Sequence, residues 1–282
     1  MVENRPFLAF LTHLVLILGV AVVVFPVYLA FIASTHGSGD FLRGLVPLLP
    51  GPHMIENYAR MLNSGLSTAG APPVWLMLAN SLFMALTIAI GKIAISIISA
   101  YAIVYFKFPF RLLAFWLIFI TLMLPVEVRI IPTFKVVADL GMLNSYAGLT
   151  IPLIASATAT FLFRQFFLTV PDELMEAARV DGAGPLKFFR DILLPLSQTN
   201  IAALFVILFI YGWVQYLWPL LVTTDSRYYT IVMGIKRLAA AAESDPYWNL
   251  VMAAVILAML PPVLVIIFMQ RLFVKGLVET EK

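Results

Sequence analysis

The sequence predicts an all-α integral membrane protein with six transmembrane helices. Of its 282 residues, 62% are hydrophobic and only 12% are charged, whereas a water-soluble domain has about a quarter of its residues charged. The apolar residues form six runs of about the 20 residues that a bilayer-spanning helix requires. The sequence has no Cys, and its three His residues lack metal-ligand spacing, so we expect no disulfide and no metal site.

We interpret the six apolar runs as the membrane spans. They are Phe10–Ala33, Trp75–Phe106, Leu112–Pro132, Ala147–Phe167, Ile201–Val222 and Leu250–Phe273. The first run follows Arg5 as the core of a signal peptide would. It is longer than a cleavable core, however, and no clear small-x-small cleavage site follows it, so we interpret it as an uncleaved span.

These spans divide the chain into five parts. We expect an N-terminal tail at residues 1–9, a first span at 10–33, an extracytoplasmic loop at 34–74, a transmembrane domain at 75–275 and a tail at 276–282. The loop is rich in Pro and Gly, which interrupt continuous helix. We expect one short helix in it, near Glu56–Leu62.

The distribution of basic residues favours cytoplasmic termini at both ends. With that orientation, ten of the 18 Lys and Arg residues lie in inside segments, seven lie in outside segments and Lys92 lies within a span. The segment Pro171–Pro195 is then cytoplasmic. The net charge of +3 is small and dispersed, so nothing indicates nucleic-acid binding.

The segment Pro171–Pro195 is predicted to contain two short helices. Pro171 suits the start of the first, and Asp172 and Glu173 place negative charge at its positive end. Gly182 is typical of a helix stop. We expect Leu174, Ala177 and Ala178 to share one face, where small side chains permit close approach by another protein.

The second short helix is expected to begin at Pro185 and to brace the first against the membrane domain. Its apolar residues follow helical spacing. They are Leu186, Phe189, Ile192 and Leu193.

A spaced motif runs through both predicted helices. Its residues are Glu176, Ala177, Ala178, Asp181, Gly182, Ala183, Phe188 or Phe189, Ile192, Leu194 and Pro195. This motif resembles the cytoplasmic EAA signature of permease subunits in bacterial ABC importers. The resemblance implies a type I ABC importer permease fold, in which Glu176, Ala177, Ala178, Asp181 and Gly182 belong to a coupling helix seated in a groove of an ATP-binding subunit.

The resemblance covers nearly the whole chain and is strongest to carbohydrate-type permeases. Within these, Thr121–Phe134, Ala157–Phe167 and Ile210–Leu221 resemble permeases for sn-glycerol-3-phosphate, as do the N-terminal ENRP and the C-terminal MQRLFVKGLVETEK. This implies an inner-membrane protein that imports sn-glycerol-3-phosphate or glycerophosphodiesters. It also implies an unlike sister permease as heterodimer partner, two copies of an ATP-binding subunit and an external substrate-binding protein.

The chain is not expected to bind ATP itself or to carry a catalytic site. A phosphate-cradling loop requires Gly, four residues and then Gly-Lys-Ser/Thr. The nearest approach, Gly91-Lys92-Ile93, lacks the upstream Gly and the hydroxyl. ATP and Mg are therefore assigned to a partner subunit.

Charged residues within the spans are costly unless they are paired or hydrated. Lys92 either attracts an anionic substrate or pairs with a carboxylate of a neighbouring helix or chain, and pairing is slightly favoured. Glu127 and Arg129 are two positions apart, so they do not face each other on a helix. Each of them either pairs elsewhere or meets the binding protein, and structural pairing is again favoured.

A group of aromatic and polar residues in the fifth run is a candidate substrate pathway. Its members are Tyr211, Trp213, Gln215 and Tyr216, with Trp218 beside them. Such side chains can pack on a glycerol or sugar backbone and donate hydrogen bonds. The aromatic residues suit an interfacial belt equally well, whereas Gln215 favours the pathway.

Three other functions remain open from the residues. A permease for an oligosaccharide or another neutral sugar is the nearest alternative. A membrane-embedded enzyme is disfavoured because no His-Ser-Asp, HExxH or paired-acid spacing occurs. A scaffold that binds the ATPase without translocation is the third.

Overall fold

A computed structural model describes residues 6–43, 47–66, 69–243 and 247–279. The regular structure in these ranges is helical, which confirms the all-α fold. The chain forms two compact units, one of Met1–Leu76 with Gly234–Leu260 and one of Met77–Met233 with Pro261–Lys282. The predicted tails at 1–9 and 276–282 fall partly outside the described residues, at 1–5 and 280–282.

The first unit contains α1 (Pro6–Ser34), the 3-10 turn η1 (Ser38–Arg43) and α2 (Met54–Asn63). The start of α3, most of α13 (Ile231–Ala242) and the first part of α14 (Trp248–Glu279) complete it. α2 confirms the short helix that was predicted in the loop. Only 6% of the apolar stretch of α1 is buried within the protein, as expected for a helix surrounded by lipid.

Asn57 of α2 holds the polar end of this unit together. Its side-chain amide donates hydrogen bonds to the Ser34 and His36 carbonyls at 2.9 and 2.8 Å. Asn249 of α14 donates to the Asn57 side-chain oxygen at 3.1 Å. Next to Asn57, Tyr58 shares a hydrogen bond with the Ser34 hydroxyl, and burial raises the pKa of Tyr58.

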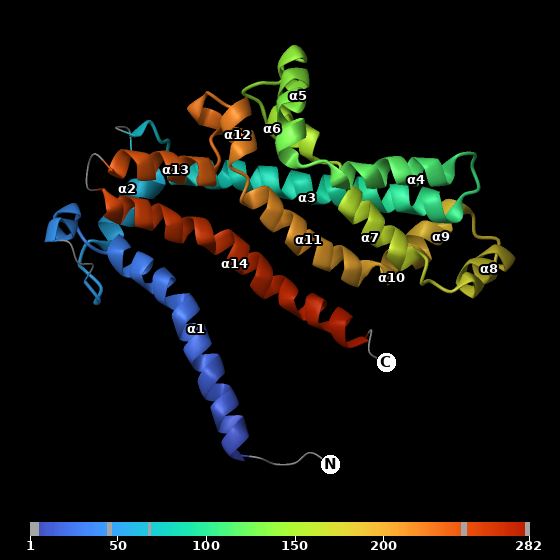
Figure 1. The fold of residues 1–282 in the computed structure, drawn as a ribbon, viewed down its shortest axis with the longest axis horizontal. Coiled ribbons are helices and arrows are strands. Elements are labelled where there is room, and N and C mark those ends of the chain that lie inside the picture. Colours follow the sequence, from blue (N-terminus) through green and yellow to red (C-terminus); the bar gives the residue numbers. More distant parts are fainter. Residues whose placement is uncertain (1–5, 44–46, 67–68, 244–246, 280–282) are drawn as a thin grey trace. The chain divides into compact units, whose positions relative to one another are not determined.

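The second unit is built around α3 (Val74–Tyr105). In Figure 1, α4 and α7 lie side by side along its second half, and α5, α6 and α12 gather beside its first half. The elements after α3 are α4 (Arg111–Ile120), η3 (Thr121–Met123), α5 (Val126–Asp139), α6 (Tyr146–Thr150), η4 (Ile151–Leu153), α7 (Ala157–Phe167), α8 (Asp172–Val180), α9 (Pro185–Phe188), the π-helical turn η5 (Phe189–Leu193), α10 (Leu194–Leu196), α11 (Gln198–Trp213), α12 (Leu217–Val222) and η6 (Ser226–Tyr228).

Three predicted spans are single long helices, and the other three are broken. The first, second and sixth runs correspond to α1, α3 and α14. The third and fourth runs bend by 108° and 44°, at breaks between η3 and α5 and between η4 and α7. The described residues thus provide three long helices, or up to six spans if each bent pair counts as one.

The prediction of one continuous fifth helix over Ile201–Val222 is wrong. α11 begins earlier, at Gln198, and the chain leaves helical geometry at Val214 before α12 starts at Leu217. The apolar pair with membrane-span character is instead Pro185–Leu196 with Gln198–Trp213, bent by 70°. Hydropathy alone did not reveal this shift, because the residues on both sides of the break are apolar.

The breaks in the third and fourth spans have local causes. Leu124 is extended because the following Pro125 disfavours helical geometry at the preceding residue. Ser156 is also extended, and its hydroxyl accepts a hydrogen bond from the Ala159 N–H at 3.2 Å, which caps α7. The breaks bring main-chain turns and polar side chains to the middle of the second unit.

A close helix contact positions the end of α11 on α3. A Cβ atom built on Gly212 would lie 2.8 Å from the Ala85 Cα, so this packing requires glycine. Nearby, Met84 and Ile88 of α3 pack in one apolar cluster with Trp218 of α12. The Trp218 indole N–H donates to the Gly148 carbonyl at 3.1 Å, which links α12 to α6.

Candidate functional site

The predicted coupling helix is α8, and its end is set by Gly182. Asp172 and Glu173 lie in its first turn, as the sequence indicates. Gly182 has a φ of +74°, a left-handed conformation that favours glycine. Its N–H donates to the Arg179 carbonyl, and the Ala183 N–H donates to the Ala178 carbonyl at 2.8 Å. This pair of bonds is a Schellman motif, which satisfies the last carbonyls of the helix.

α8 exposes most of the residues that carry the motif. Ala178 is buried, whereas Leu174, Glu176, Ala177 and Asp181 are exposed. The expectation that Ala178 shares an open face with Leu174 and Ala177 is therefore corrected, since Ala178 faces the chain's own packing. None of the ion pairs in the described part of the chain involves Glu176. The coupling role of these residues stays a prediction.

The second short helix begins at Pro185 and connects α8 to the end of α3. The Tyr101 hydroxyl donates to the Pro185 carbonyl at 2.8 Å, and the Phe188 ring lies 5.3 Å from the Tyr105 ring. Leu186, one of the apolar residues of this helix, does not take part in that packing within the chain, because it is 79% exposed. Phe188 is buried instead, because the helix turns that side towards α3.

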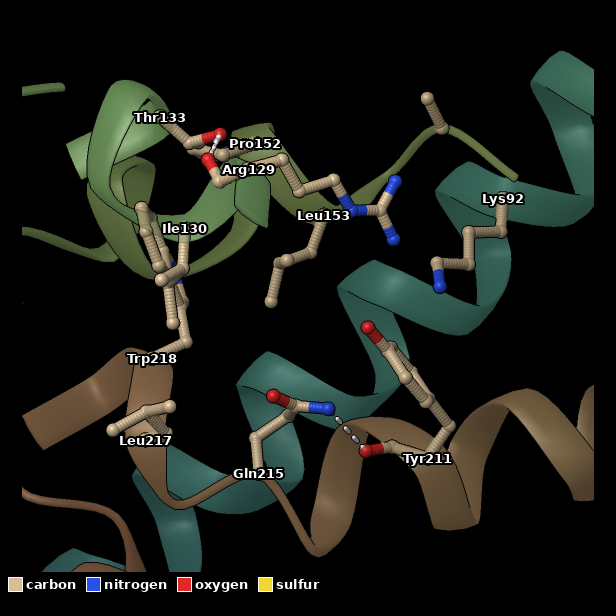
Figure 2. A pocket seen from close by; sticks show the side chains of 11 residues that line it. Lys92, Arg129, Ile130, Thr133, Pro152, Leu153, Tyr211, Gln215, Leu217 and Trp218 are labelled. Carbon is tan, nitrogen blue, oxygen red and sulfur yellow. Dashed lines mark hydrogen bonds between the residues drawn. The ribbon is translucent and has the colours of Figure 1, made fainter. Parts of the chain in front are cut away.

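Lys92 of α3 lines a cavity of about 160 Å³ in the second unit. Arg129 and Thr133 of α5 line it as well, together with Tyr211 and Gln215 from the end of α11. Figure 2 shows the Lys92 ammonium, the Arg129 guanidinium and the Tyr211 hydroxyl directed into the same space. The tertiary structure thus brings together three of the five predicted pathway residues.

The ammonium of Lys92 rests on an aromatic ring. Its Nζ lies 3.7 Å from the centroid of the Tyr211 ring, and Lys92 is only 7% exposed. Such a cation–π contact contributes about 0.5–2 kcal/mol. No described Asp or Glu of this chain forms an ion pair with Lys92, and a carboxylate partner from a neighbouring chain stays a prediction.

The remaining predicted pathway residues lie differently. The Gln215 side-chain amide donates to the Tyr211 carbonyl at 3.1 Å, which holds Gln215 at the cavity wall. Trp213 is buried and stacks on Phe209 with ring centroids 5.8 Å apart. Neither Trp213 nor Tyr216 lines the cavity.

Arg129 and Thr133 belong to the cavity although they were not predicted as pathway residues. Both lie on α5, beyond the 108° bend that separates α5 from α4. A signal was present in the sequence, because Pro125 marks the break and Arg129 and Thr133 are four positions apart on one helix face. The side chain of Glu127 lies outside the described residues.

A second, larger cavity of about 730 Å³ adjoins the first. The two share Lys92, Arg129, Ala155 and Tyr211 in their walls. Small polar residues at the start of α7, among them Ser156 and Thr158, line the larger cavity. No group of three or more His, Cys, Asp or Glu residues suited to a metal ion occurs in the described parts of the chain.

The part of the chain that contains the cavity and the exposed helix α8 matches a known protein family. The family described as "Binding-protein-dependent transport system inner membrane component" matches residues 92–279. The chain belongs to this family. It is therefore a multi-pass inner-membrane permease of an ABC importer, a transport subunit that works with partner subunits and a binding protein.

The permease is similar over its whole length to proteins named "sn-glycerol-3-phosphate transport system permease protein UgpE". It is 60% identical to that of Agrobacterium fabrum, 59% to that of Brucella melitensis and 58% to that of Escherichia coli O6:K15:H31. Each alignment covers 282 residues, which is all of both chains.

A solved structure shares the fold of the permease. It is a chain of a bacterial ABC transporter involved in the import of the acidic polysaccharide alginate, with a TM-score of 0.79 at 21% identity. The match covers 96% of this chain and 98% of that one. The ABC importer permease fold, expected from the sequence motif, is confirmed.

Proposed function

We propose that the permease imports sn-glycerol-3-phosphate, or related glycerophosphodiesters, across the inner membrane by alternating access. The observation that carries this proposal is the full-length similarity, at 58–60% identity, to permeases named for that substrate. The cavity beside Lys92 and Arg129 supports it, because an anionic substrate requires cationic groups along its path.

In this proposal, α8 faces the cytoplasm and receives the movement of a partner ATPase. Both termini are cytoplasmic, in keeping with the distribution of Lys and Arg. Glu176 is exposed and has no ion-pair partner in the described part of the chain, so its carboxylate is available to another subunit. ATP and Mg bind to that partner, and this chain contributes no catalytic group.

The proposed assembly contains an unlike sister permease, two copies of the ATP-binding subunit and an external substrate-binding protein. The exposed surface of α1 suits a helix that meets lipid. Lys92, Tyr211 and Gln215 are assigned to the substrate path because they line one cavity. Trp213 and Tyr216 are assigned to packing at the end of α11.

The test is ATP-dependent uptake of labelled sn-glycerol-3-phosphate by vesicles that contain the complete transporter. The Glu176→Ala variant should reduce uptake while the subunits still assemble. Glu56→Ala is the matched control, because Glu56 of α2 is also exposed and its pairing is limited to His53. Uptake of a neutral sugar in place of sn-glycerol-3-phosphate by the wild type would overturn the substrate assignment and leave the permease function intact.

A further inference from the structure

Two cations face one cavity in the second unit without a described counter-charge. Lys92 and Arg129 both line the 160 Å³ cavity and the 730 Å³ cavity beside it. No described carboxylate lies within ion-pair distance of either side chain. Lys92 is only 7% exposed, whereas Arg129 is exposed, so the cavity carries a buried and an accessible positive charge whose mutual repulsion an anion between them would relieve.

An aromatic ring contacts the Lys92 ammonium, and no described carboxylate pairs with it. The Tyr211 ring supports the Lys92 ammonium from one side at 3.7 Å, and its hydroxyl is directed into the cavity (Figure 2). An aromatic ring stabilises a cation without accepting conventional hydrogen bonds from its N–H groups, as a carboxylate partner would. The ammonium donors therefore remain available to a ligand, as do those of the planar guanidinium of Arg129.

A polar wall stands opposite the cations in the smaller cavity. Gln215 uses its amide N–H to bind the Tyr211 carbonyl, and its side-chain oxygen is turned towards the cavity (Figure 2). That oxygen accepts no hydrogen bond from the described residues and can accept one from a hydroxyl group. The cavity therefore presents cationic donors on one side and a neutral acceptor on the other.

We propose that Lys92 and Arg129 form a phosphate subsite inside the permease, with Gln215 facing the hydroxyl groups of the glycerol end. This proposal rests on the proposed function, since it assigns the two ends of that substrate within the path. A volume of 160 Å³ is roughly ten times what one water molecule requires. The subsite therefore admits a small polar molecule at the junction with the larger cavity.

The subsite has a chemical consequence for substrate preference. A phosphate monoester carries about −1.5 to −2 charges at pH 7, whereas a phosphodiester carries about −1. Two cations stabilise the monoester more than the diester, so loss of one cation should penalise the monoester more. A residue with a merely structural role would lower transport of both substrates equally.

The experiment measures uptake of labelled sn-glycerol-3-phosphate and of glycerophosphoglycerol by vesicles that contain the complete transporter. Lys92→Gln and Arg129→Gln should each lower monoester uptake about tenfold or more, with a smaller loss for the diester. Lys92→Arg should retain most uptake because it keeps the charge. Lys135→Gln is the matched control, because Lys135 lies on α5, is exposed and pairs with Asp139 outside the cavity.

ATPase activity stimulated by the binding protein should persist in both Gln variants, which shows that they assemble. Wild-type uptake rates in these variants, or equal losses for the two substrates, would overturn the subsite while leaving the proposed function standing. Failure of the wild type to take up either phosphate ester would overturn the proposed function, and the subsite with it.

Discussion

The α8 segment and the Lys92 cavity belong to the same compact unit, yet they are specified in different ways. The α8 segment is built from neighbours in sequence, within Pro171–Pro195, and most of its surface is exposed. The cavity combines side chains from α3, α5 and α11, which are separated by long stretches of chain. The α8 segment is thus encoded by residues close together in the sequence, whereas the cavity depends on tertiary packing.

The largest expected loss of stability distinguishes the buried side of the α8 segment from its exposed side. Phe188→Ala removes a buried ring that packs against α3, and we expect a loss of about 3–5 kcal/mol of stability. Leu186→Ala, two residues away, changes a side chain that is 79% exposed and should cost less than about 0.5 kcal/mol. Thermal unfolding and limited proteolysis of the assembled transporter measure both. Equal effects would show that Leu186 is also packed in the assembled transporter.

The next largest effect tests whether the close packing of α11 on α3 is needed for the shape of the cavity. Gly212→Val places atoms against the Ala85 main chain and should destabilise the contact between α11 and α3 by about 1–3 kcal/mol. Gly19→Val is the control, because no heavy atom lies within 4 Å of its added Cβ. We expect the first variant to lower the melting temperature and uptake together. An unchanged melting temperature would contradict the close approach of these helices.

A smaller effect tests the end of α8. Gly182→Val forces a β-branched residue into a left-handed conformation, which costs about 1–2 kcal/mol. Because no neighbouring atom would clash with the new side chain, the strain should act on the helix end itself. Transport should fall more than ATP hydrolysis. Gly184→Ala is the control, since its φ of −71° suits any residue, and a similar loss there would argue against a special role for Gly182.

The smallest effect concerns the break before α7. Ser156→Ala removes the hydroxyl that caps this helix and should cost about 1 kcal/mol. Ser99→Ala changes another hydroxyl in the wall of the larger cavity, but one that bonds only within α3. Chemical denaturation that distinguishes the two variants would support the capping role. Identical stability would indicate that the break is held by other contacts.

Much of the fold could be predicted because membrane helices have a strong hydropathy signal. The three long helices and α8 followed from apolar length, Pro and Gly positions and charge at a helix end. The broken spans were not predicted, because each break interrupts a run whose average hydropathy is still that of a membrane span. Hydropathy does not record the local features that end helices there, such as Pro125 and the Ser156 cap.

The candidate cavity was predicted in part. Lys92 and Gln215 stand out because charged and polar residues are rare in membrane spans. Their proximity could not be derived, and Arg129 was expected to form structural pairs. The bend between α4 and α5 places Arg129 in the same cavity as Lys92. Tyr211 and Trp213 are two positions apart on α11 and so lie on different faces of that helix, and only Tyr211 lines the cavity.

The sequence alone predicted a helical membrane protein with an exposed, Gly-terminated α8, because apolar run length and local turn chemistry depend on residues close together in the chain. The permease assignment came from the resemblance of its motif to a known family. Which polar side chains share a cavity and which are packed away became clear from the three-dimensional arrangement of the helices. A helix fixes the relative directions of its own side chains, whereas bends and close contacts between helices distant in sequence determine which side chains meet.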